Sequence, residues 1–197
     1  MSRILVLYGT TDGHTRKVAQ ALGVTLGADG SRVDVINAAV AAADLRPEDY
    51  DAVFVAASVH ARGYQRAVKE WVHAHAPALN RMPTAFLSVC LGILEEDPET
   101  TRDVHRIMHR FLNRAGWYPA ATEIVAGALP YTRYGWLKKF IMRRIAAKAG
   151  ADTDTSQDYE YTDWAALDRF AMDFVRREGL VHDEKARGQS APRAPVA

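Results

Sequence analysis

The fold is decided by one stretch near the amino terminus, ILVLYGTTDGHT, which spans residues 4–15. Its first part, residues 4–8, is a continuous apolar run of the kind that forms a buried parallel strand. Residues 15–26 then predict a helix, because their leucine and valine side chains recur on one face. Glycine and threonine dominate the residues between. The chain therefore opens with a strand, a tight loop and a helix.

Four further apolar segments alternate with helical patterns along the chain. Strands are expected at residues 32–36, 52–57, 84–89 and 120–126, and helices at residues 66–75, 99–115 and 162–177. Pro77 and Pro83 are expected to bracket the turn after residues 66–75, and Thr162 or Asp163 to cap the last helix. This alternation predicts an α/β fold, a doubly wound five-stranded parallel sheet. In the strand order 2-1-3-4-5, ligands bind beyond the carboxyl ends of strands one, three and four.

Composition narrows the class of protein. The chain has 197 residues, 48% of them hydrophobic, which suits one domain over residues 1–179 followed by a disordered tail, 180–197. Its 25 basic and 24 acidic residues give a net charge of +1, so no nucleic-acid partner is expected. A single cysteine, Cys90, excludes an internal disulfide and fits the cytoplasm. We find no signal peptide and no run of about 18 apolar residues that could span a bilayer.

The loop after the first strand has the composition of a phosphate site. Its glycines permit a turn that aims backbone N–H groups inward, its threonines add hydroxyl donors, and the following helix contributes a partial positive charge. It is neither a Walker A sequence nor GxGxxG, and an ordinary capped turn is the alternative. The acidic side chain in the loop would have to point away from an anion. The candidate residues are Thr10, Thr11, Asp12, Gly13, His14 and Thr15.

Two other loops follow the third and fourth strands, at the same edge of the sheet. Small residues there let backbone groups reach a planar ring, and Tyr64 or His60 could cover a ring face. The alternative is that His60, Arg62 and Tyr64 are ordinary exposed loop residues. Cys90 is expected to pack beside a cofactor rather than to act as a nucleophile, because no base is placed near it. The candidates are Ser58, Val59, His60, Tyr64, Ser88, Val89, Cys90, Leu91 and Gly92.

Several segments resemble the flavodoxin-like family of bacterial quinone-dependent protoporphyrinogen IX dehydrogenases (oxidases). They are SVHARGY at 58–64, MPTAFLSV at 82–89, AGALPYTRYGW at 126–136, TDT at 153–155 and YTDW at 161–164. The loop at 10–15 is also similar to the flavodoxin signature for FMN. Over residues 3–177 the resemblance implies a flavodoxin-like fold, FMN as cofactor, and oxidation of protoporphyrinogen IX to protoporphyrin IX in haem synthesis, with electrons passed to a membrane quinone. The acidic, apolar stretch at 90–97 departs from the basic, polar one expected.

An insertion of about residues 127–161 follows the fifth strand and exceeds an ordinary connection. Within it, residues 134–148 predict a helix with one apolar face, a tryptophan near its start and otherwise basic side chains. That pattern is typical of a helix lying in an anionic membrane interface, which would place the protein on the inner face of the cell membrane. Two alternatives remain: a core helix with a solvated basic face, or basic side chains that contact the propionates of a porphyrin.

The resemblance favours an enzyme in which the flavin accepts a hydride from the tetrapyrrole. In that reading His60 is a candidate proton acceptor, and Arg62 a candidate partner for a substrate carboxylate. The alternatives are a flavodoxin-type electron carrier, which the basic insertion disfavours, an NAD(P)H:quinone reductase, and a flavin-free interaction protein. The sequence predicts no metal site.

Overall fold

We describe a computed structural model of the chain, which covers residues 1–28, 30–60, 63–91, 98–129, 154, 156 and 158–180. Its centre is a five-stranded sheet with the order β2-β1-β3-β4-β5, in which all neighbouring strands are parallel. This confirms the predicted doubly wound sheet and its strand order. The strands are β1 (Arg3–Gly9), β2 (Arg32–Asn37), β3 (Ala52–Ser58), β4 (Thr84–Cys90) and β5 (Ala121–Ala126).

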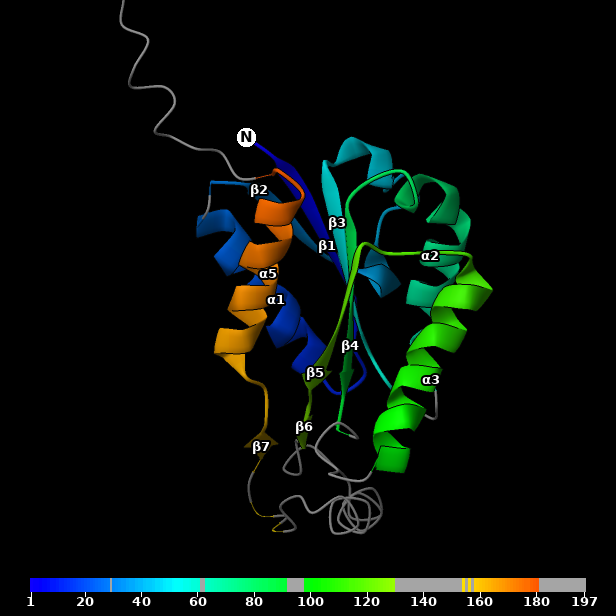
Figure 1. Ribbon diagram of the computed structural model, residues 1–197, viewed down its shortest axis with the longest axis vertical. Coiled ribbons are helices and arrows are strands. Elements are labelled where there is room, and N and C mark those ends of the chain that lie inside the picture. Colours follow the sequence, from blue (N-terminus) through cyan, green and yellow to red (C-terminus); the bar gives the residue numbers. More distant parts are fainter. Residues whose placement is uncertain are drawn as a thin grey trace, which may run out of the picture.

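Helices cover both faces of the sheet (Figure 1). One face carries α1 (His14–Ala28) and α5 (Trp164–Arg177), and the other carries α2 (Arg66–Leu79) and α3 (Pro98–Ala115). Two 3-10 turns, η1 (Ala38–Val40) and η2 (Pro47–Asp49), lie in the connection between β2 and β3. The sheet is thus a middle layer between two pairs of helices.

The apolar strands create two cores, because successive side chains point to opposite faces of a strand. Ile4 and Val6 contribute to the core under α1 and α5, whereas Leu5 and Leu7 contribute to the core under α2 and α3. All four side chains are fully buried. Burial on both faces explains why the β1 segment is a continuous apolar run rather than an alternating one.

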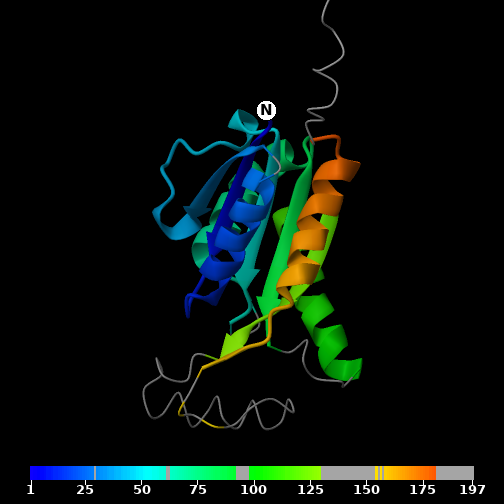
Figure 2. The same ribbon diagram turned by 90° about the vertical axis from the view of Figure 1, so that its left-hand side faces the viewer.

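The ends of the inserted segment form a small second sheet that the sequence did not predict. Strand β6 (Ala128–Leu129) pairs antiparallel with β7 (Tyr159–Glu160). Figure 2 shows this pair beyond the carboxyl ends of the central strands. The predicted amphipathic helix at residues 134–148 lies outside the described residues, as do residues 181–197 of the predicted tail.

The structure corrects the predicted end of α2 and decides between the two predicted N-caps of α5. The helix predicted to end at residue 75 continues through Pro77 to Leu79, so the turn before Pro83 begins only at Asn80. Ala78 and Leu79 are buried against the sheet, and this packing favours the extra turn despite the missing N–H of the proline. At α5, Asp163 is the N-cap and its carboxylate accepts a hydrogen bond from the backbone N–H of Ala166.

Candidate functional site

The loops after β1, β3 and β4 meet at the carboxyl edge of the sheet, where ligands bind in doubly wound folds. β1 and β3 are neighbours in the sheet, and the chain passes from β1 to α1 on one face and from β3 to α2 on the other, so the strand order reverses between them. The sequence prediction placed its three candidate loops at this edge. The structure brings the first two into direct contact through side chains.

The loop between β1 and α1 is shaped for an anion. Gly13 has a φ of 93°, a backbone conformation that favours glycine, and its N–H donates to Thr10 Oγ1 at 2.9 Å. Thr15 lies in the first turn of α1 and is 1% exposed, yet its Oγ1 has no hydrogen-bond partner within the described part of the chain. A buried hydroxyl without a partner is costly, and a phosphate at the helix N-terminus would provide one. The residues present therefore fit a phosphate group.

Gly9 is needed for the close approach of α2 to this loop. A Cβ added at Gly9 would lie 2.5 Å from Val68 Cγ2 and 3.0 Å from Gln65 Oε1. Gln65 precedes α2, and its amide Nε2 donates to Thr11 Oγ1 at 3.1 Å and to Ser58 Oγ at 2.7 Å. One side chain thus ties the phosphate loop to the loop after β3. Its Oε1 is buried and lacks a partner among the described residues. The sequence analysis missed Gln65, because no local pattern distinguishes it.

His60 connects the same two loops. Its Nε2 lies 3.5 Å from the Asp12 carboxylate, and its backbone N–H and C=O exchange hydrogen bonds with Gly63. The Asp12 side chain faces this imidazole, which answers the objection that an acid in the loop would repel a phosphate. Arg62, the other candidate for contact with the substrate, lies outside the described residues.

Tyr64 and Ser88 are buried rather than exposed at the carboxyl edge of the sheet. Tyr64 is 5% exposed, and its hydroxyl lies 2.7 Å from the oxygen of the fully buried Ser88. Its ring packs against Phe86 and Phe111 in the α2–α3 core, and burial raises the pKa of its hydroxyl well above the ordinary value. The expectation that Tyr64 could cover a ring face is therefore wrong. The three aromatic rings attract one another, and this keeps the tyrosine inside.

The end of β4 presents backbone rather than side chains. Val89 and Cys90 are nearly buried, and their carbonyl oxygens accept hydrogen bonds from the N–H groups of Val59 and Gly127. Leu91 is half-buried, and Gly92 lies outside the described residues. A Cβ at Gly127 would lie 3.4 Å from the carbonyl carbon of Cys90, so the chain leaving β5 passes close to the end of β4. Cys90 is a packing residue here, as the sequence suggested.

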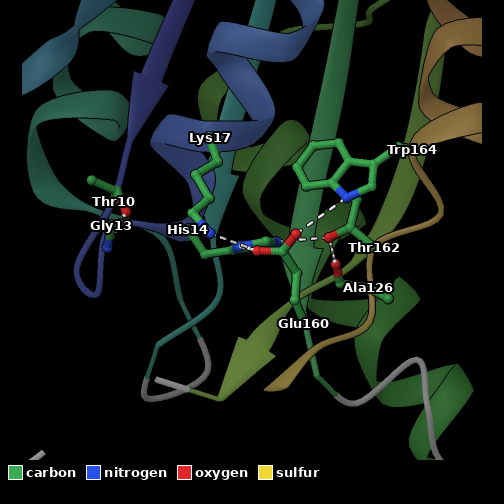
Figure 3. A network of polar contacts seen from close by, with 8 residues as sticks. All are labelled: Thr10, Gly13, His14, Lys17, Ala126, Glu160, Thr162 and Trp164. Carbon is green, nitrogen blue, oxygen red and sulfur yellow. Dashed lines mark hydrogen bonds and ion pairs between the residues drawn. The ribbon is translucent and has the colours of Figure 1, made fainter. Parts of the chain in front are cut away.

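His14 points away from the phosphate loop, into a polar network with the returning strand of the insertion (Figure 3). Thr162 donates to the carbonyl of Ala126 at 2.7 Å, so it accepts from His14 Nε2, which lies 2.7 Å away. On the other side of the ring, His14 Nδ1 lies 3.6 Å from Glu160 Oε2. Of His14, only the backbone remains available to a phosphate.

Glu160 accepts hydrogen bonds from the two other donors of this network, on Lys17 and Trp164. Its carboxylate accepts from Lys17 Nζ at 2.8 Å and from Trp164 Nε1 at 3.2 Å. Burial lowers the pKa of His14, an effect that Glu160 opposes and Lys17 reinforces. Burial thus disfavours the charged form of His14, and Nε2 is the ring nitrogen that donates to Thr162. The network fixes the start of α1 against β7, one boundary of the inserted segment.

The part of the chain described by the structure contains no group of three or more metal-ligating side chains. In that same part, no helix is long and apolar enough to cross a bilayer. Among the described residues, the carboxyl edge offers backbone N–H groups, hydroxyls, the amide of Gln65, and the imidazole of His60 beside the carboxylate of Asp12. These groups suit the binding and orientation of an anionic cofactor, and the described residues there contain no nucleophile paired with a base.

Comparisons with known proteins agree with this geometry. The model of the flavodoxin domain family matches residues 5–156. Protoporphyrinogen IX dehydrogenase [quinone] of Escherichia coli K12 is 35% identical over 88% of this chain and 94% of its own. The protein of the same name from Leishmania major is 36% identical over 88% of this chain and 74% of its own.

Solved flavodoxins share the fold. A short-chain flavodoxin associated with a bacterial microcompartment has a TM-score of 0.54 at 17% identity, covering 90% of this chain and 99% of its own. Oxidised flavodoxin 1 of Bacillus cereus has a TM-score of 0.53 at 13% identity, covering 89% of this chain and 98% of its own. The chain belongs to the flavodoxin domain family and, within it, to the family of the quinone-dependent protoporphyrinogen IX dehydrogenases.

Proposed function

We propose that this protein is an FMN-dependent oxidoreductase that converts protoporphyrinogen IX to protoporphyrin IX in haem synthesis and passes the electrons to a membrane quinone. The observation that carries the proposal is the 35% identity to dehydrogenases of that name over 88% of the chain. The unpartnered, buried Thr15 hydroxyl supports the cofactor, because it is the kind of group a bound phosphate would satisfy.

The described residues suggest a division of labour. The hydroxyls of Thr10 and Thr15 and the N-terminus of α1 would hold the FMN phosphate, while Gln65 keeps the phosphate loop and the ring loop together. FMN, when bound, would supply a two-electron acceptor that the quinone reoxidises, and complete conversion of protoporphyrinogen IX to protoporphyrin IX would take three such two-electron steps. His60 is the proposed proton acceptor, since it is exposed at the ring loop and its Nε2 lies 3.5 Å from the Asp12 carboxylate, which would orient the imidazole.

Contact with the membrane is a separate part of the proposal. The helix predicted at residues 134–148 would bring the domain to an anionic surface, where a quinone is reached from the lipid. Flotation with vesicles that contain anionic lipid tests it. We expect the protein to float at low salt and to remain behind at high salt, because salt screens the attraction. Failure to float at low salt would contradict this part alone.

The activity is tested by the fluorescence of the product. Purified protein loaded with FMN is mixed with protoporphyrinogen IX and a soluble quinone without oxygen, and porphyrin fluorescence is followed. A parallel sample receives NADPH in place of the tetrapyrrole. We expect porphyrin to form at a rate that depends on enzyme and quinone. Oxidation of NADPH by the quinone without porphyrin formation would identify an NAD(P)H:quinone reductase instead.

A further inference from the structure

A groove runs between α2 and α3, on the face of the sheet opposite α1 and α5. The two helices lie side by side there (Figure 1). The groove has a volume of about 490 Å³, and Gly63 and Tyr64 are among the residues that line it. This size is within the range of small-molecule sites. We call it the α2–α3 groove.

Its walls carry unneutralised positive charge. Lys69 from α2 and Arg110 and Arg114 from α3 line the groove, and all three side chains are exposed. Within the described part of the chain none of these three side chains has an ion pair, whereas Arg66 and Arg106 on the same helices each have one. The acidic side chain in the groove, Glu70, is already paired, since its carboxylate lies 2.6 Å from Arg66 Nε. The walls therefore favour an anion.

Its floor is apolar. Phe111 and Tyr64 are nearly buried there, with ring centroids 5.0 Å apart, and Ile107 adds an aliphatic surface. A fully hydrated inorganic anion would gain little from such a floor. The combination selects a molecule with an apolar body and carboxylates at its margin.

The groove also begins beside the candidate flavin site. Gly63 lines the groove and exchanges backbone hydrogen bonds with His60, so the groove and the candidate flavin site share the loop after β3. Among the reactants of the proposed reaction, the quinone is uncharged and the FMN phosphate has its own loop. The tetrapyrrole is the reactant that combines an apolar macrocycle with two propionates.

We propose that the α2–α3 groove binds the propionate-bearing side of the tetrapyrrole, with Arg110 and Arg114 as carboxylate partners and Phe111 beneath the macrocycle. This inference rests on the proposed function and deepens it. It assigns substrate recognition to the described helices rather than to the inserted segment.

The test compares Arg110→Gln/Arg114→Gln with Arg32→Gln/Arg81→Gln, a control pair that removes the same charge at exposed positions outside the groove. Binding of protoporphyrin IX to the FMN-loaded protein is measured by fluorescence, together with KM and kcat for protoporphyrinogen IX and the affinity for FMN. Two exposed ionic contacts predict a Kd and a KM about 2- to 30-fold higher in the groove variant, with kcat and FMN affinity unchanged.

The dimethyl ester of protoporphyrin IX, which lacks the two free carboxylates, tests whether the groove recognises those charges. We expect it to bind wild type and groove variant equally, and more weakly than the acid binds wild type. Equal binding of acid and ester by wild type, or an equal loss in the control pair, would overturn the inference. A wild type that binds the porphyrin through the groove yet oxidises no porphyrinogen would instead refute the proposed function, so the two failures are distinguishable.

Discussion

Replacement of Thr15 by valine should change the free and the FMN-bound protein in opposite directions. The substitution keeps the size and the β-branch of the side chain and exchanges the hydroxyl for a methyl group. Thr15 is 1% exposed and its Oγ1 has no partner among the described residues. In the protein without FMN, the change removes a buried, unsatisfied hydroxyl, and we expect the free energy of unfolding to rise by about 1 kcal/mol.

In the FMN complex the same change removes a hydrogen bond to a charged phosphate. Such a bond contributes about 1.5–3 kcal/mol, so the Kd for FMN should rise by about 10- to 150-fold. Urea unfolding of the apoprotein and titration with FMN measure the two effects. Thr122→Val, at an exposed position on β5, is the matched control and should change neither quantity appreciably.

Two results would refute the reasoning. An unchanged affinity for FMN would mean that the phosphate does not reach Thr15, and the loop would be an ordinary capped turn. A less stable apoprotein would mean that the hydroxyl is satisfied in the free protein. The opposite signs of the two expected changes distinguish a binding group from a residue that only supports the fold.

Three further substitutions test the surroundings of the site. Gln65→Ala removes the two hydrogen bonds that connect the loops after β1 and β3, and should weaken FMN binding by about 2- to 10-fold in a calorimetric titration. An unaltered affinity would show that these hydrogen bonds are not needed to position the two loops. Burial lowers the pKa of His14, so the unfolded chain takes up the proton first as the pH falls below about 6.5. The free energy of unfolding of the apoprotein should therefore decline from about pH 7 to pH 5.5, and the decline should be smaller in His14→Gln. Identical pH profiles of the two proteins would contradict a contribution of His14 to this decline. Tyr64→Phe should cost about 1–3 kcal/mol, measured by urea unfolding, because it leaves the buried Ser88 hydroxyl unpaired, and adding Ser88→Ala should recover part of that loss; no recovery would mean that the pair is not coupled.

The sheet could be predicted from the sequence because its signal is local. Residues 4–8 and 52–57 are apolar without interruption, and the structure buries both segments on both faces. The loop between β1 and α1 was distinctive for the same reason, since its glycines and threonines lie next to one another, and its role as the phosphate site stays a prediction. The end of α2 was predicted wrongly at Pro77, where burial of the following residues outweighs the local preference.

The parts of the site that could not be predicted depend on contacts between segments that are distant in the sequence. His14 and Thr162 are 148 residues apart, and Gln65 meets a threonine 54 residues earlier. The two-residue strands β6 and β7 are too short to show any periodicity. Tyr64 follows a polar loop and carries a hydroxyl, so local reasoning placed it at the surface, whereas its aromatic neighbours come from β4 and α3.

The central claim is that bound FMN takes the electrons of protoporphyrinogen IX. Complete oxidation of protoporphyrinogen IX to protoporphyrin IX removes three pairs of electrons, whereas one FMN accepts a single pair. The most direct test therefore mixes the tetrapyrrole with an excess of FMN-loaded protein without oxygen or quinone, and records flavin absorbance and porphyrin fluorescence in the same cell. We predict that the flavin colour fades as fluorescence appears, that added quinone restores the colour, and that apoprotein shows neither change. Porphyrin formation without bleaching of the flavin, or bleaching by NADPH but not by protoporphyrinogen IX, would contradict the claim.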